Sequence, residues 1–386
     1  MFDYGVEAFL ADTKLSGRVG LVTNNTGRDR HGIHTADRIQ AHGKLELKAI
    51  FSPEHGFGSD APDGEAVDSS KHPKFGVPII SLYGTRKKPS PQDLEGLDLL
   101  VYDIQDVGVR FYTYISTLRN ILESAAECGL PMHVLDRPDL LGGESVEGPN
   151  LTEGFSSFIG HLPVPLRYGL TCGELAGWWN HRMGNTVKLT VWRCRNWKRG
   201  MAFENLGVPW VKPSPSMSTT ATARFYPGTC LFEGTNLSEG RGTEAPFQII
   251  GAPWINADLW LEKLVPLLPP SVTATKAAFK PTFSKFTGEE CRGIKLATRN
   301  YILYKSVDIG IRAIHSLIRT HPGKVAFEHR GNFRQPFFDY LAGNSWLREG
   351  LAALEPINKL EERAGLESLP FTESRRAFFL YPSGSI

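Results

Sequence analysis

The sequence has few cysteines, no long hydrophobic run and almost no net charge. Its five cysteines include no C-x-x-C pair, so zinc knuckles and thioredoxin-type motifs are excluded and free, mostly buried thiols are expected. No stretch approaches the roughly 18 consecutive apolar residues of a membrane span. Its 43 basic and 41 acidic residues give a formal charge of +2, which argues against a nucleic-acid or anionic-membrane partner attracted by bulk charge.

The sequence also lacks the glycine motifs of nucleotide-binding proteins. Its first predicted strand is followed by TNNTG at residues 23–27 instead of G-x-G-x-x-G, and no P-loop pattern occurs. Without those glycines the backbone cannot approach a pyrophosphate closely. We therefore expect no nicotinamide or flavin cofactor.

The first four residues contain neither the basic region nor the apolar core of a signal peptide. As the sequence stands we expect a cytoplasmic protein, and a periplasmic or secreted one if a leader has been removed. The sequence leaves the oligomeric state open.

Short apolar runs alternate with helical patterns through the first half of the chain. The runs are too short for helices and rich in Val, Ile and Leu, as in strands buried on both faces. They cover residues 18–23, 47–51, 79–82, 99–104 and 133–135. Apolar residues recur at helical spacing over 111–125, and Gly129 follows as a stop signal. This alternation predicts a Rossmann-like, doubly wound parallel sheet of the α/β class.

The second half is punctuated by proline and glycine. Strand candidates at 188–193 and 293–297 stand apart from a helix candidate at 307–320, which is typical of an α+β domain. A length of 386 residues suits two domains. We assign residues 1–205 to the Rossmann-like domain and 206–386 to the C-terminal α+β domain.

Polar side chains follow every predicted strand of the first half. The carboxyl ends of parallel strands meet at one edge of the sheet, where ligands bind. Together these ends predict a polar crevice. Its candidate residues are Asn24, Glu54, His55, Tyr83, Asp103, Gln105, Asp106 and Arg137.

Glu54 and His55 are the most informative pair in this crevice. Pro53 restricts the backbone before them and Gly56 frees it after them. A glutamate in a partly closed crevice can have the raised pKa that a general acid needs near neutral pH. The alternative is that Glu54 caps a helix or pairs with an arginine. No H-E-x-x-H pattern accompanies His55, so we expect no metal site.

Two further polar clusters allow more than one interpretation. Asp103, Gln105 and Asp106 precede Arg110 and Tyr112, and such acids can bind a divalent metal, contact sugar hydroxyls or hold Arg110 as scaffolding. The segment 233–243 interleaves three glycines with charged and hydroxyl side chains, which indicates either a backbone that approaches a ligand or a long connection built from Asx turns.

These motifs, taken together, resemble the exo-β-N-acetylmuramidase (NamZ) family of glycoside hydrolases. The resemblance covers most of the chain in family order. Its stretches are GRVGLVTNNTG (17–27), SPEHG (52–56), SLYG (81–84), DIQDVGVRFYTYISTL (103–118), LDRPD (135–139), VEGP (146–149), WVKPSP (210–215), YPGTCLFEGTNLSEGRGT (226–243) and GAPW (251–254).

The resemblance implies an enzyme that removes N-acetylmuramic acid from the non-reducing ends of peptidoglycan fragments. It implies an active-site cleft between the two domains, with Glu54 of the P-E-H-G motif as catalytic glutamate. The chain departs from the family at Gly58 and Ser59, where arginine and glycine are usual. That departure keeps open a non-catalytic sensor of cell-wall fragments. A metal-dependent hydrolase using His55, Asp103 and Asp106 is a third hypothesis.

Glycosidases usually need two carboxyl groups, one on each side of the scissile bond. With Glu54 as the acid, the candidates for the second carboxyl are Asp60, Asp106 and Glu239. Alternatively, the substrate's own 2-acetamido group attacks the anomeric carbon. This chemistry requires no metal and no organic cofactor.

The lactyl carboxylate of muramic acid requires a cation in the site. Arg241, Arg110 and Arg137 are the candidates, because arginine binds carboxylates bidentately. Tyr112 is a candidate for stacking on the sugar. The remaining predicted substrate contacts are Asn24, His55, Asp60, Tyr83, Gln105 and Asn236.

Overall fold

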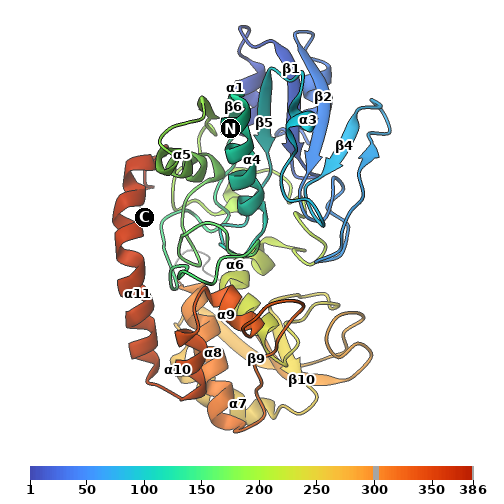
Figure 1. The fold of residues 1–386 in the computed structure, drawn as a ribbon. Coiled ribbons are helices and arrows are strands. Elements are labelled where there is room, and N and C mark those ends of the chain that lie inside the picture. The colour runs from blue at the N-terminus through green and yellow to red at the C-terminus, as the bar shows by residue number, and fades with distance from the viewer. Residues whose placement is uncertain (299–303, 385–386) are drawn as a thin grey trace.

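The N-terminal half of the protein forms a seven-stranded, mostly parallel sheet. The structure is a computed structural model that describes residues 1–298 and 304–384 (Figure 1). The strand order is β3-β4-β2-β1-β5-β6-β7, and only the edge strand β3 pairs antiparallel. The strands are β1 (Gly17–Thr23), β2 (Leu45–Ser52), β3 (Ser70–Lys71), β4 (Pro78–Ser81), β5 (Leu99–Asp103), β6 (Met132–Leu135) and β7 (Leu189–Trp192).

This sheet confirms the predicted doubly wound fold. Strand β1 lies between β2 and β5, so the chain builds the sheet first to one side and then to the other. Every residue of β5 is buried, as expected for a strand covered on both faces. The covering helices are α1 (Gly5–Leu10), α2 (Thr35–Gln40), α3 (Pro91–Leu94), α4 (Tyr114–Cys128) and α5 (Cys172–Arg182). As predicted, α4 ends at Gly129, which has a left-handed φ of 66°.

The second domain packs helices on a small antiparallel sheet, which confirms the α+β prediction. Its strands β8 (Ile249–Ala252), β9 (Val272–Phe279) and β10 (Cys291–Thr298) have the order β8-β10-β9. Helix α8 (Ser306–Thr320) is central and packs against α6 (Thr220–Thr229) and α7 (Ala257–Leu264). The other elements are η1 (Phe203–Leu206), η2 (Cys230–Gly234), η3 (Val265–Leu267), α9 (Phe337–Ala342), α10 (Trp346–Ala352), α11 (Ile357–Ser374) and η4 (Arg375–Phe378).

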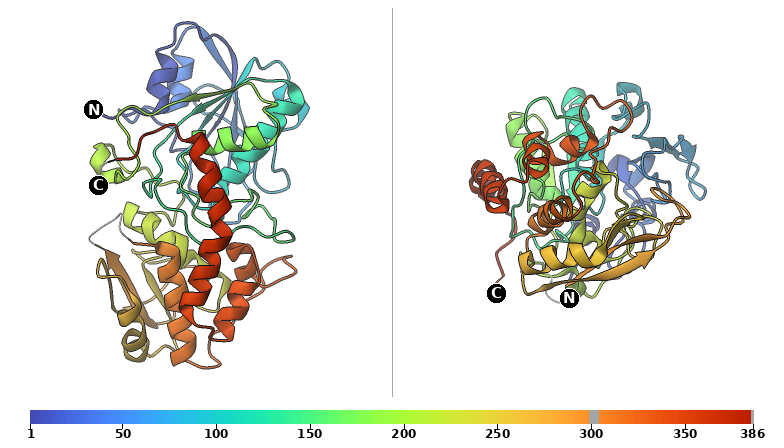
Figure 2. Two further views of the ribbon diagram at one scale, coloured as in Figure 1. Left: turned by 90° about the vertical axis from the view of Figure 1, so that its left-hand side faces the viewer. Right: turned by 90° about the horizontal axis from the view of Figure 1, so that it is seen from below.

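The long helix α11 runs along one side of the molecule and carries the chain back to the first domain (Figures 1 and 2). There the Tyr381 hydroxyl donates to Asp136 Oδ2 at 2.6 Å, and the Leu380 N–H donates to Glu174 Oε1 at 2.8 Å. Arg375 caps the carbonyl of Gly169. The last part of the segment that we assigned to the second domain, residues 375–381, therefore packs against the first domain.

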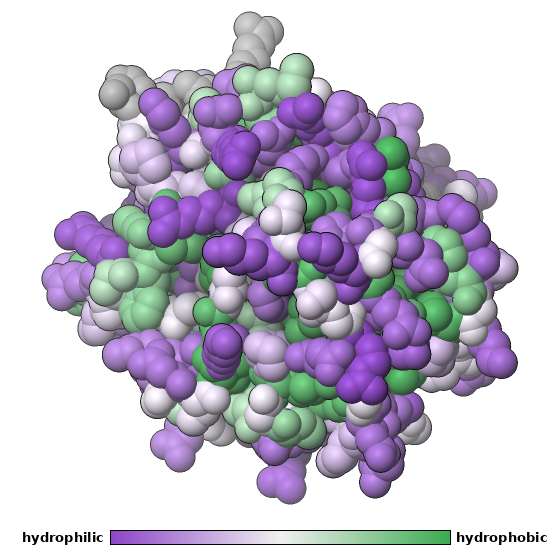
Figure 3. All heavy atoms as spheres, turned by 90° about the horizontal axis from the view of Figure 1, so that it is seen from above, coloured by the Kyte–Doolittle hydropathy of each residue, from purple (hydrophilic) through white to green (hydrophobic). Residues whose placement is uncertain are grey.

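The surface and the cysteines are those of an ordinary globular chain. Viewed from above, hydrophilic residues dominate and hydrophobic ones show between them (Figure 3). All five cysteines are free thiols, and only Cys128 is exposed, as expected. Among the described residues, no helix combines the length and apolar character needed to cross a membrane.

Candidate active site

Two adjoining cavities lie between the domains. The first has a volume of about 420 Å³ and is lined by Glu54, and the second has a volume of about 720 Å³ and is lined by Glu239. Because they share part of their lining, they form one continuous cleft. The residues lining both cavities are Asp63, Glu233, Arg241, Arg330 and Phe337.

Glu54 lies just beyond β2, where the chain turns sharply. His55 and Gly56 both have left-handed backbone angles, with φ of 69° and 73°. The Glu54 side chain is buried and both its oxygens are occupied: Oε1 accepts the Gly64 N–H at 3.0 Å and Oε2 accepts the Thr113 hydroxyl at 2.6 Å. Its hydrogen-bond partners within the described chain are thus neutral donors and not an arginine, and one of them, Thr113, is the N-cap residue of α4.

Aromatic and basic side chains complete the wall around Glu54. Burial, followed by the charge of the Glu54 carboxylate, raises the pKa of Tyr83 well above its ordinary value. The Lys87 ammonium lies 3.7 Å from the centre of the Tyr83 ring and 4.4 Å from that of Phe158. Tyr112 lines the same cavity, but it is buried and packs in T-shaped contacts against the rings of Tyr114 and Tyr226.

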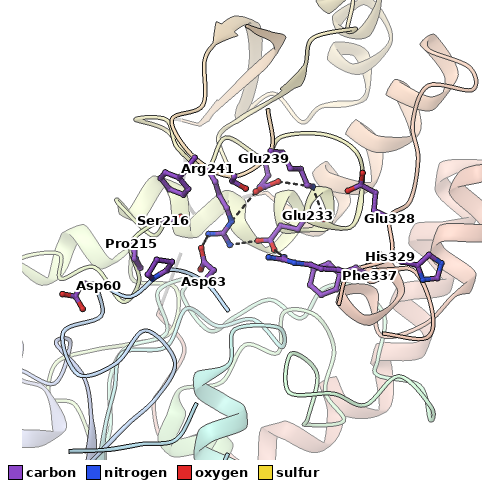
Figure 4. A pocket seen from close by; sticks show the side chains of 15 residues that line it. Asp60, Asp63, Pro215, Ser216, Glu233, Glu239, Arg241, Glu328, His329 and Phe337 are labelled. Atoms are coloured by element: carbon purple, nitrogen blue, oxygen red, sulfur yellow. Dashed lines mark hydrogen bonds and ion pairs between the residues drawn. The ribbon is translucent and has the colours of Figure 1, made fainter. Parts of the chain in front are cut away.

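Arg241 ties three carboxylates together across the cleft (Figure 4). Its guanidinium pairs with Asp63, with Glu233 Oε1 at 2.6 Å and with Glu239 Oε1 at 3.3 Å. Asp63 belongs to the loop after β2 in the first domain, whereas both glutamates belong to the segment 233–243 of the second. One guanidinium therefore joins the two sides of the site.

Lys285 shapes the segment that carries the two glutamates. Its ammonium contacts a ring of oxygens, which are the carbonyls of Phe232 at 3.1 Å, Glu233 at 3.0 Å, Thr235 at 2.6 Å and Leu237 at 2.9 Å, and Glu239 Oε2 at 3.4 Å. Four backbone carbonyls pointing at one site would repel one another without a cation between them. The polar segment predicted from the sequence is therefore wrapped around a lysine that lies far from it in the chain.

The pKa values of the two glutamates move in opposite directions. Burial tends to raise the pKa of Glu233, but the positive charges of Arg241 and Arg330 outweigh burial and hold it below its usual value. Burial raises the pKa of Glu239 against the opposing charge of Lys285, and the neighbouring Glu233 adds to that rise. Glu233 is therefore the carboxylate that this site keeps ionised.

Seven predicted site residues lie outside both cavities, and each has hydrogen-bond or ion-pair partners elsewhere in the described structure. They are Asn24, Asp103, Gln105, Asp106, Arg110, Arg137 and Asn236. Asp106 accepts the Tyr168 hydroxyl and the Gly108 N–H, and burial raises its pKa to about 7. Arg110 is completely buried and donates to three backbone carbonyls, and burial lowers its pKa to about 9.

The remaining residues of this group also have structural partners. Asp103 forms an ion pair with Arg137 at 2.6 Å. The arginine that it holds as scaffolding is therefore Arg137, whereas we expected Arg110. Asn24 donates to the Tyr114 hydroxyl at 2.8 Å. Gln105 donates to the carbonyls of Asp106 and Pro138, and Asn236 bridges backbone groups of Lys324 and Ala326.

The structure brings the other predicted residues into the cleft. They are Glu54, His55, Asp60, Tyr83, Tyr112, Glu239 and Arg241. It adds residues that the sequence reasoning missed: Asp63, Lys87, Thr113, Glu233, Lys285 and Arg330. Glu233 was within reach, because it opens the polar segment 233–243. The others had no recognisable signal, since they lie in irregular loops or, for Thr113, just before a helix.

The two departures from the family pattern lie beside this site. Ser59 has a left-handed φ of 58°, a conformation that favours glycine. A side chain at Gly58 would meet Asp60 Oδ1 at 2.8 Å, so an arginine there requires Asp60 to move. Asp60 itself is exposed at the rim of the larger cavity.

The metal-hydrolase hypothesis finds no matching cluster. His55 contacts the Ala61 carbonyl through Nδ1 at 2.9 Å and lies 3.7 Å from Asp63 through Nε2, whereas Asp103 is paired with Arg137. Within residues 1–298 and 304–384, no group of three or more His, Cys, Asp or Glu side chains is arranged to hold a metal ion.

Comparisons with known proteins agree over the whole chain. Residues 19–221 match the family model for the N-terminal part of exo-beta-N-acetylmuramidase NamZ, and residues 224–381 match that for the C-terminal part. The peptidoglycan beta-N-acetylmuramidase NamZ of Bacillus subtilis (strain 168) is 41% identical over 384 residues, which cover 98% of this chain and 91% of that protein.

Two solved structures share the fold. A DUF1343 family protein of Bacteroides fragilis NCTC 9343 is 31% identical with a TM-score of 0.90, and the match covers 98% of this chain and 99% of that one. A second DUF1343 family protein from the same strain is 29% identical with a TM-score of 0.78, and each chain is fully covered.

Proposed function

This chain belongs to the exo-β-N-acetylmuramidase NamZ family, and we propose that it hydrolyses peptidoglycan fragments in the cleft between its domains, releasing N-acetylmuramic acid from their non-reducing ends. Family membership establishes a glycosidase. The roles of individual residues are our assignment, and they rest on the geometry of the cleft.

One observation carries the assignment: Glu54 and Glu233 line the same cavity of about 420 Å³ from opposite domains. A pair of carboxyl groups facing one space is the arrangement that glycoside hydrolysis uses. Of the three partners that we predicted for Glu54, Asp106 and Asp60 are not in this cavity, and Glu239 lines only its neighbour. Asp63 also lines this cavity, but it comes from the same domain as Glu54, so we assign the role of second carboxyl group to Glu233.

The two carboxyl groups have different tasks in this proposal. Glu54, as the acid, gives its proton to the glycosidic oxygen while the bond to the anomeric carbon breaks. Because Thr113 is bound through its hydroxyl, the hydroxyl can rotate and accept a hydrogen bond from the protonated form of Glu54. Glu233 stays ionised and stabilises the positive charge that develops at the anomeric carbon.

Two routes for the second half of the reaction share this arrangement. Either Glu233 acts directly on the anomeric carbon or on a water molecule, or it orients the 2-acetamido group of the substrate for attack. A thiazoline mimic of the cyclised acetamide distinguishes them. Tight competitive inhibition supports the substrate-assisted route, and inhibition no better than that by free N-acetylmuramic acid supports the direct one.

The assignment of Glu54 is tested with a chromogenic β-glycoside of N-acetylmuramic acid. We expect the wild type to release the chromophore and Glu54→Gln to lose about a hundredfold or more in kcat. Glu328→Gln is the matched control, because it makes the same change at an exposed residue lining the larger cavity. Equal activity of wild type and Glu54→Gln would move the acid elsewhere. Binding without release by the wild type would favour the sensor alternative.

A further inference from the structure

Three cations line the cavity that contains Glu54, and they differ in how far their charge is already balanced. Arg241 is paired with three carboxylates. Arg330 has one weak partner, Glu233 Oε2 at 3.3 Å, and its side chain is 55% exposed. Within the described chain, Lys87 has no carboxylate within 4.0 Å. Lys87 is thus the cation lining this cavity that forms no ion pair within the described chain, and the Glu54 carboxylate acts on it only from farther away.

The position of Lys87 is fixed, although its charge is unpaired. Its ammonium lies over the rings of Tyr83 and Phe158, and its carbonyl accepts the side-chain N–H of Asn120 at 2.8 Å. Burial lowers the pKa of Lys87, while the Glu54 carboxylate opposes that fall. A half-buried ammonium held by two aromatic faces is pre-organised for an anion, because part of its desolvation and ordering has taken place before the anion arrives.

We propose that Lys87 binds the lactyl carboxylate of N-acetylmuramic acid and thereby selects muramyl over glucosaminyl substrates. The proposal rests on the proposed function, since it takes the sugar bound beside Glu54 to be N-acetylmuramic acid. The lactyl group is the feature that separates this sugar from N-acetylglucosamine, and an ammonium ion is a direct means of recognising its charge. Arg241, our expectation from the sequence, would have to give up one of its present carboxylates to do the same.

The test compares substrates that differ only in the charge of the lactyl group. The substrates are the chromogenic glycoside of N-acetylmuramic acid and its lactyl carboxamide, assayed with wild type and Lys87→Met. We expect Lys87→Met to lose roughly ten- to a hundredfold in kcat/KM on the carboxylate and little on the carboxamide. Lys88→Met is the matched control, because Lys88 is the next residue but pairs with Glu127 outside the cavity.

Several outcomes would overturn the proposal. An equal loss on both substrates would mean that Lys87 acts through Glu54 or through folding. No loss in Lys87→Met, with loss of discrimination in Arg330→Met, would assign the carboxylate to Arg330. If the wild type hydrolyses neither substrate, the proposed function fails, but calorimetry with free N-acetylmuramic acid and N-acetylglucosamine still tests Lys87. Equal preference of wild type and Lys87→Met for the muramyl sugar would then refute it.

Discussion

The two carboxyl groups of the cleft are held in opposite ways. Glu54, from the first domain, is held by a backbone N–H and a hydroxyl, whereas Glu233, from the second, is held by Arg241 and Arg330. Neutral donors fix the direction of a carboxyl group without tying it to a permanent positive charge. Guanidinium groups keep a carboxylate ionised. The same residue type is thus prepared for two tasks by its neighbours alone.

The difference also explains why the site needs both domains. Each domain supplies one carboxyl group, and the pair between Asp63 and Arg241 spans the gap. The completely buried Arg110 adds a second connection, since it donates to carbonyls of Pro149 and Val164 and also to that of Leu341. Movement of one domain against the other would therefore alter the catalytic pair before it altered either fold.

The largest effect should come from removing the charge of Glu233. We expect Glu233→Gln to lose roughly a hundredfold to ten-thousandfold in kcat on the chromogenic glycoside, because the positive charge at the anomeric carbon loses its partner. Glu239→Gln should lose much less, since burial already favours the neutral form of that residue. Equal losses in the two variants would remove the distinction drawn between these glutamates.

The next largest effect should come from removing Arg241, and it should appear in the pH dependence of kcat and of stability. In Arg241→Met, the effect of burial on Glu233 is opposed only by the weaker pair with Arg330 and by Lys285, so the pKa of Glu233 should rise and the acid limb of kcat should move to higher pH. Stability should fall by about 3–5 kcal/mol near neutral pH, where the buried carboxylates are ionised without their partner. The stability difference from wild type should shrink as pH falls and protonates them.

Urea unfolding at several pH values measures this effect. The matched control is Arg292→Met, which breaks a surface pair with Glu290 at 3.6 Å and should cost about 1 kcal/mol or less. An unshifted acid limb in Arg241→Met would show that Glu233 does not depend on Arg241 for its charge.

The smallest effect should come from Lys285, which acts on Glu233 and Glu239 through the backbone. We expect Lys285→Gly to lose about tenfold in kcat, because four carbonyls lose a shared donor and the segment 233–243 relaxes. Added ammonium ions should restore part of the activity by entering the vacated ring of oxygens. Lys280→Met, an exposed lysine on the same stretch of chain, should change nothing. A loss without rescue would indicate a general folding defect.

The fold could be predicted because its signals are local. Buried parallel strands appear in the sequence as short runs of Val, Ile and Leu, and Gly129 marks the end of α4 in a left-handed conformation that glycine adopts more easily than other residues. The position of Glu54 followed from the same logic, since it stands where a strand must end at the ligand-binding edge of the sheet.

The rest of the site depends on which distant groups meet, and the sequence carries no signal for that. Arg137 and Asp103 both follow strands and looked available for a ligand, but they neutralise each other. Glu239 was chosen from its segment and Glu233 was not, and only folding places Glu233 in the cavity that Glu54 lines. Lys87 follows no pattern, so its unpaired charge is visible only once the cavity is assembled.

The return of α11 to the first domain has a consequence for how the protein is made. A ribosome releases chains at roughly 5–20 residues per second, and N-terminal domains often fold before the rest has emerged. Here the first domain still lacks Tyr381, whose hydroxyl holds Asp136, and Leu380, whose amide holds Glu174, until residues beyond the second domain's helices have been added. The packing around Asp136 and Glu174 in the first domain is therefore completed only after the domain that carries Glu233 has been synthesised.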